Sequence, residues 1–142
     1  MSAQRPMPHP TAWSRAFWEA ASRRQFVIQE CRACKKLIMY PKRVCPACLG
    51  EDLGWREASG RGEVYTVTVQ MAGPPSGFED RLPYVLAVIR LEEGVQMMSN
   101  LVGPGSMEAR CGDPVVADFE TAGEVTLPVF RLAAAKAGGS AR

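Results

Sequence analysis

The strongest indication of the fold of this 142-residue chain is a pair of Cys-x-x-Cys motifs, Cys31-Arg32-Ala33-Cys34 and Cys45-Pro46-Ala47-Cys48. Ten residues separate the two Cys-x-x-Cys pairs, and a loop this short lets four thiolates close a tetrahedral metal site. Structural zinc sites of the four-Cys type keep no coordination position open for a substrate. The spacing therefore predicts a zinc ribbon whose metal ligands, Cys31, Cys34, Cys45 and Cys48, have a structural role.

A helix is expected before the cysteines. Between residues 11 and 24, apolar side chains recur at a spacing that places them on one helical face, at Trp13, Phe17, Ala20 and Ala21. Trp18 lies off this stripe. It is interpreted either as a docking anchor for a partner or, preferably, as a side chain that packs on the neighbouring ribbon.

Strands are predicted on both sides of the cysteines and throughout the second half of the chain. In the ribbon, Phe26 to Glu30 leads into the first pair and Leu37 to Tyr40 returns from it. From Glu57 onward, apolar runs alternate with Gly/Pro turns. Five such runs with a break after the third predict an OB-type barrel, over residues 62–71, 83–91, 95–102, 115–120 and 127–132.

The expected fold is mainly β and has four segments. They are an N-terminal arm and helix (1–25), the zinc ribbon (26–56), the five-stranded barrel (57–132) and a flexible tail (133–142). The strand at 83–91 is apolar on both faces, since Val85, Ala87 and Ile89 alternate with Leu86 and Val88. Such a strand must be covered twice, and the second cover is expected from the ribbon, the helix or a partner protein.

Charge is unevenly distributed along the chain. Residues 1–56 hold ten Lys/Arg and four Asp/Glu, whereas residues 57–142 hold seven and eleven. The basic half is suited to contact phosphates, either of nucleic acid or of coenzyme A. The equally weighted alternative is an ordinary solvated surface.

Catalytic groups are scarce in this sequence. The lone histidine, His9, lies in a Pro-rich start, and Cys111, outside the two pairs, is best explained as a packed thiol. No Ser-His or Cys-His pair can be built on a scaffold from these residues. The sequence therefore argues against an enzyme that acts alone.

The sequence also bears on compartment. It shows neither a signal peptide nor an apolar run of transmembrane length. Metal-ligated, reduced cysteines are typical of the cytoplasm, which is the expected location.

The order and spacing of several motifs resemble those of one known family. The stretches that carry the resemblance are Phe26-Val27-Ile28-Gln29-Glu30-Cys31, Tyr40-Pro41-Lys42-Arg43, Ser59-Gly60-Arg61-Gly62-Glu63-Val64-Tyr65-Thr66, Pro83-Tyr84-Val85 and Cys111-Gly112-Asp113-Pro114-Val115. Together with the four cysteines they are similar, over residues 12–132, to the acyl-CoA-associated OB-fold family with a rubredoxin-like zinc ribbon, also known as domain of unknown function 35.

The resemblance implies a non-catalytic accessory subunit. Members of that family accompany thiolase-superfamily enzymes, so the implied partner is a thiolase-like enzyme in a two-plus-two assembly. The chain would help to form or cover the partner's acyl-CoA site, in the degradation of an aromatic- or steroid-derived acyl-CoA. Zn²⁺ is the expected cofactor and a CoA ester the shared ligand. The residues expected to contact the partner or the CoA ester are Trp13, Phe17, Trp18, Lys42, Arg43 and Phe78.

Two other functions are weighed against this one. Zinc ribbons and OB folds also bind single-stranded nucleic acid, but Tyr65 is expected to face the core and the barrel half is acidic. Four cysteines also accept iron, which would make an electron-transfer protein. That alternative leaves the attached barrel unexplained.

Overall fold

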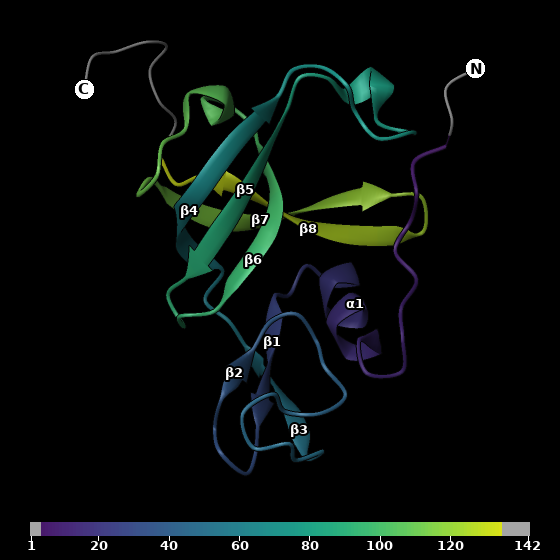
Figure 1. Cartoon of the computed structure of the whole chain (residues 1–142), viewed down its shortest axis with the longest axis vertical. Helices are drawn as coiled ribbons and strands as arrows, with labels where there is room; N and C mark the ends of the chain where they lie inside the picture. The colour runs from purple at the N-terminus through teal and green to yellow at the C-terminus, as the bar shows by residue number, and fades with distance from the viewer. Residues whose placement is uncertain (1–3, 135–142) are drawn as a thin grey trace.

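The computed structural model describes residues 4–134 as a small ribbon and a barrel, with one helix beside both (Figure 1). The N-terminal and ribbon elements are α1 (Arg15–Ser22), β1 (Val27–Cys31), β2 (Leu37–Ile38) and β3 (Leu53–Glu57). The barrel elements are β4 (Arg61–Gln70), η1 (Glu79–Arg81), β5 (Tyr84–Leu91), β6 (Gln96–Val102), η2 (Ser106–Glu108), β7 (Pro114–Ala122) and β8 (Val125–Leu132). Most of the predicted flexible tail, residues 135–142, lies outside the described residues.

The ribbon is a three-stranded antiparallel sheet with the order β2-β1-β3. Its third strand, β3, was not predicted, because Gly54 and the charged residues around it give no strand pattern. A Cβ at Gly54 would lie 2.9 Å from the guanidinium of Arg32, an exposed side chain that can move aside. The buried Gln29 of β1 holds the loop after β2 in place, because its side chain exchanges two hydrogen bonds with the backbone of Lys42.

The predicted barrel is confirmed as a closed five-stranded barrel with the order β4-β5-β6-β8-β7. Closure between β6 and β8 is parallel and short, with only the pairs Leu101↔Phe130 and Val102↔Arg131. Beyond these pairs the two strands diverge, and Ser99 Oγ donates a hydrogen bond to the carbonyl of Pro128 at 2.9 Å. The part of this junction without ladder pairs, residues 96–100 of β6 beside residues 125–129 of β8, is named the β6–β8 seam.

The prediction that Tyr65 faces the core is wrong. The register between β4 and β5 shifts between Val64 and Thr66, so a β-bulge inserts one extra residue into the alternation. Val64 is buried, Val67 packs against the core, and Tyr65 is exposed between them. The guanidinium of Arg90 lies 4.5 Å from the Tyr65 ring centroid and covers its face.

The helix is shorter than predicted. Hydrogen bonds between Thr11 and Ser14 close a separate turn first, and α1 begins only at Arg15. Trp13 therefore lies in this turn, outside the helix, and is 43% exposed. The predicted stripe holds for Phe17, Ala20 and Ala21, which are buried.

An aromatic ladder joins the helix, the ribbon and the barrel. Phe17 of α1 packs edge-on against Phe26 at 6.2 Å, and Phe26 packs edge-on against Phe130 of β8 at 6.0 Å. Just after α1, the Arg24 guanidinium donates a hydrogen bond to the carboxylate of Asp118 on β7 at 2.7 Å. These contacts fix the ribbon to the barrel as one packed body.

The strand β5 is covered on its inner face by the barrel core, where Val85, Ala87 and Ile89 are buried. On its outer face, Leu86 and Val88 are only half-buried. The helix does not provide the second cover, since α1 packs chiefly on β8 and β1. In the described part of the chain, no helix is long and apolar enough to cross a membrane.

Candidate metal centre and docking surface

The four cysteines of the two pairs meet at the end of the ribbon. All four Sγ atoms lie within 4.8 Å of one another, and the Cys31–Cys48 and Cys34–Cys45 sulfur pairs are each 3.6 Å apart. A tetrahedral zinc ion with Zn–S bonds of about 2.3 Å requires sulfurs about 3.8 Å apart. The donor set and its spacing therefore fit Zn²⁺ held by four thiolates.

The two cysteine turns are built in the same way. The amide of Lys35 donates to the carbonyl of Cys31 at 2.8 Å, and the amide of Leu49 donates to the carbonyl of Cys45 at 2.9 Å. Lys35 has a φ of 66° and Leu49 a φ of 64°, so both residues adopt the left-handed conformation that favours glycine. The two halves of the centre are thus matched turns related by approximate symmetry.

Backbone amides lower the pKa of the two buried cysteines, Cys45 and Cys31. The backbone N–H of Cys48 is the main cause that lowers the pKa of Cys45 to about 6, and the N–H of Ala47 also points at its sulfur, at 3.4 Å. The pKa of Cys31 is lowered chiefly by a hydrogen bond from the backbone N–H of Cys34. Thiolates are the form that binds zinc, so the backbone favours the metal-binding state.

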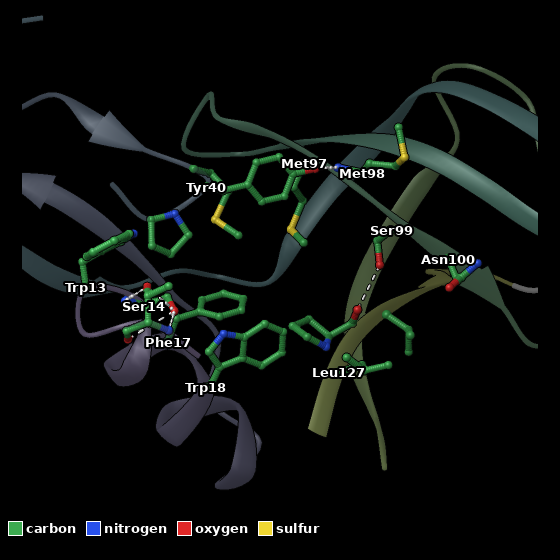
Figure 2. Close-up of a pocket in the computed structure, with 15 residues that line it drawn as sticks. Trp13, Ser14, Phe17, Trp18, Tyr40, Met97, Met98, Ser99, Asn100 and Leu127 are labelled. Carbon is green, nitrogen blue, oxygen red and sulfur yellow. Dashed lines mark hydrogen bonds between the residues drawn. The ribbon is translucent and has the colours of Figure 1, made fainter. Parts of the chain in front are cut away.

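An apolar hollow of about 450 Å³ lies where the helix, the ribbon and the barrel meet. It opens over the β6–β8 seam, and Figure 2 shows side chains of all three modules around it. Its larger lining residues are Trp13, Phe17, Trp18, Met39, Tyr40, Met97, Met98, Leu127 and Pro128. Trp13, Tyr40 and Met98 are exposed, and Trp18 is half-buried.

Several polar groups at the hollow are already paired within the chain. Tyr40 Oη accepts a hydrogen bond from the backbone N–H of Met98 at 2.6 Å, which connects the ribbon to the seam. Ser99 donates across the seam to Pro128, and the hydroxyls of Thr11 and Ser14 bond to each other. The hollow therefore presents an apolar surface, of the kind that other proteins or apolar ligands cover.

The residues predicted to contact a partner lie in three places. Trp13 and Trp18 line the hollow together, and Lys42 and Arg43 are exposed on the loop that follows its rim residue Pro41. Phe17 also lines the hollow, but it is only 5% exposed and belongs to the aromatic ladder, so it offers little surface for a contact.

Phe78 lies apart from the hollow. Its ring packs against Tyr84 at 5.9 Å, and the Arg5 guanidinium of the N-terminal arm lies 5.4 Å from its centroid. Sequence reasoning missed Tyr40 and Met98 as surface residues. The adjacent Met97 and Met98 offered one signal, because methionine is common at adaptable binding surfaces.

Family models match most of the chain. The model described as the ChsH2 rubredoxin-like zinc ribbon domain matches residues 18–54. The model described as the ChsH2 C-terminal OB-fold domain matches residues 55–120. A solved chain of the "Ltp2-ChsH2(DUF35) aldolase" is 41% identical with a TM-score of 0.80, and the match covers 90% of this chain and 100% of that one.

Two curated relatives are longer than the matched region. A probable enoyl-CoA hydratase alpha subunit of Thermomonospora curvata is 46% identical over 120 residues, which is 83% of this chain and 37% of that protein. A DUF35 domain-containing scaffold protein of Pyrococcus furiosus is 42% identical over 65 residues, which is 45% of this chain and 47% of that protein. The chain thus spans between a third and a half of these relatives.

Proposed function

This chain belongs to the ChsH2 zinc-ribbon and OB-fold family of DUF35 proteins, and on that premise we propose that it is a non-catalytic scaffold subunit of a CoA-ester enzyme. The proposed partner is a thiolase-like aldolase, whose acyl-CoA site this chain helps to form or cover. The proposed substrate is an aromatic- or steroid-derived acyl-CoA, in which the partner enzyme cleaves a carbon–carbon bond. The assembly is proposed to hold two copies of each protein in the cytoplasm.

The observation that carries the proposal is the apolar hollow over the β6–β8 seam. Exposed Trp13, Tyr40 and Met98 form an apolar patch on its rim, and the Tyr40 hydroxyl is already hydrogen-bonded within the chain. Protein interfaces are enriched in such aromatic and methionine side chains. The half-buried Leu86 and Val88, on the outer face of β5, extend the patch beyond Met98, which pairs with Val88.

Lys42 and Arg43 directly follow Pro41, which lines the hollow. Both side chains are exposed, and neither forms an ion pair within residues 4–134. A CoA ester carries negatively charged phosphates at one end and an apolar acyl group at the other. Cations near an apolar hollow would therefore suit it. They equally suit an acidic surface on the partner enzyme.

Binding to purified Ltp2, the enzyme named with the solved relative, tests the proposal. We expect zinc-loaded wild-type chain to form a stable complex, and Trp13→Ala or Trp18→Ala to bind at least about 10-fold more weakly. Met107→Ala, a truncation of an exposed apolar side chain away from the hollow, is the control and should bind normally. Wild-type chain that fails to bind, or Trp variants that bind as well as wild type, would refute the proposed docking surface.

A further inference from the structure

The Pro-rich start of the chain, which the proposed function does not use, packs against the barrel as an extended arm. Residues 4–10 form neither helix nor strand, and Figure 1 shows them passing the tip of the β7–β8 hairpin and reaching the β4–β5 loop. The backbone of Arg5 lies so close to Gly77 of that loop that a Cβ at Gly77 would be 2.7 Å from the Arg5 Cα. Farther along the arm, the terminal methyl of Met7 lies 3.7 Å from where a Cβ at Gly123 would be, in the hairpin turn. The arm therefore connects two loops that are far apart in the sequence.

Arg5 makes the polar and aromatic contacts of the arm. Its guanidinium lies 3.4 Å from a carboxylate oxygen of Glu120 on β7 and 5.4 Å from the centroid of the Phe78 ring. Only 18% of the Arg5 side chain is exposed, and an arginine is buried to this extent only when its charge is paired. The same Glu120 oxygen accepts a hydrogen bond from Arg81 of η1 at 3.0 Å. One carboxylate thus holds the arm, the β4–β5 loop and the hairpin together.

Prolines make the arm stiff between this contact and the helix. They occupy alternate positions, at Pro6, Pro8 and Pro10. Pro-rich segments act as semi-rigid spacers of about 3.1 Å per residue. Thr11 follows directly, and its hydrogen bonds with Ser14 close the turn that carries Trp13. Because Trp13 lines the hollow, the docked end of the arm is connected by a stiff segment to an exposed aromatic side chain of the hollow.

We propose that residues 4–10 are a strap, whose docking on the barrel holds Trp13 in the conformation that binds the partner enzyme. The strap is held by the arm-binding surface, defined as Gly77, Phe78, Glu120 and Gly123. The effect on the partner rests on the proposed function, whereas the docking of the arm does not. A side chain that is held in place before binding avoids part of the cost of ordering it on binding. Release of the arm at its distant end should therefore weaken binding at the hollow.

Two glycines of the β4–β5 loop supply a matched pair of variants. Gly77 and Gly73 both have a positive φ, of 92° and 65°, so alanine strains the backbone at either position. Only Gly77 contacts the arm, because a Cβ at Gly73 would meet no atom within 4 Å. In zinc-loaded Gly77→Ala, the NMR order parameters of the Met7 and His9 amides should fall from about 0.85 to below about 0.6. Affinity for purified Ltp2 should fall at least about fivefold, and Gly73→Ala should match wild type in both measurements.

A double variant, Pro8→Gly with Pro10→Gly, separates docking from its effect on Trp13. It leaves the contacts of Arg5 in place but makes the connection flexible, so Met7 should stay ordered while the affinity for Ltp2 still falls.

Several outcomes would overturn the strap. They are an arm that is already mobile in the wild type, a released arm with unchanged affinity for Ltp2, and equal losses of affinity in both alanine variants, which a direct contact of the loop would explain. Wild-type affinity in the double proline variant would show that stiffness does not carry the effect. Wild-type chain that does not bind Ltp2 refutes the proposed function and the effect on the partner, and the order parameters then decide the docking of the arm by themselves.

Discussion

Replacing Phe26 by alanine tests whether the ribbon and the barrel fold as one unit. Phe26 is 5% exposed and makes edge-on contacts with Phe17 and Phe130, so it connects all three modules. Buried Phe-to-Ala changes cost about 3–5 kcal/mol. That range includes two aromatic pairs worth about 0.5–1.5 kcal/mol each. Since a domain of this size is stable by about 5–15 kcal/mol, the variant should retain only part of its stability.

Urea unfolding with zinc in constant excess measures this loss. We expect one transition for the wild type and a drop of about 3–5 kcal/mol in the free energy of unfolding for Phe26→Ala. Phe78→Ala removes the same atoms from a half-buried loop and should cost about 1 kcal/mol or less. A loss below about 1.5 kcal/mol for Phe26→Ala, or separate transitions for ribbon and barrel in the wild type, would contradict the single packed body.

Three further predictions concern the metal, pH and backbone packing. In Cys45→Ser, zinc content should fall to near zero, because structural zinc contributes about 10–16 kcal/mol in finger peptides. Amide hydrogen exchange should then become faster in the ribbon and at Met98, and ribbon amides that stay protected would refute this. The pKa of Asp118 is lowered chiefly by its hydrogen bond from Arg131, so its stabilising effect is present above about pH 4 and is lost as pH falls through the folded pKa. Asp118→Asn should cost about 1–3 kcal/mol at pH 7 and flatten the acid limb of thermal melts, and an unchanged acid limb would contradict that role. Gly62→Ala should prevent normal β4–β5 pairing, because its Cβ would overlap the backbone carbonyl of Arg90; a melting temperature equal to that of the wild type would show that the strands adjust.

Local patterns in the sequence predicted the elements that local chemistry specifies. The Cys-x-x-Cys spacing fixed the metal centre, because two short turns leave the thiolates few other arrangements. The barrel strands followed from alternation and Gly/Pro punctuation, and their order closes as expected. The ribbon strand β3 escaped notice because its interior holds Gly54, which pattern reading treats as a breaker.

Features that strand alternation and helical spacing do not encode escaped prediction. The bulge at Val64 reverses the face of Tyr65, and nothing in the alternation marks an extra residue. Trp13 continues the helical spacing, yet hydrogen bonds between Thr11 and Ser14 close a different turn. The hollow joins Trp18 to Leu127 through the tertiary packing of α1 on β8, so no sequence window contains it.

The β6–β8 seam affects whether the chain can be cut into a separate ribbon and a separate barrel. The two family models meet between residues 54 and 55, inside β3, which is hydrogen-bonded to β1 of the ribbon. A barrel cut out at that boundary would lose Tyr40 and leave the amide of Met98 and the edge of β6 without their cover. Open strand edges with exposed apolar side chains recruit other strands. The boundary between the two family models is thus not a boundary between independent folding units, and the barrel expressed alone should self-associate along the part of β6 that Tyr40 normally covers.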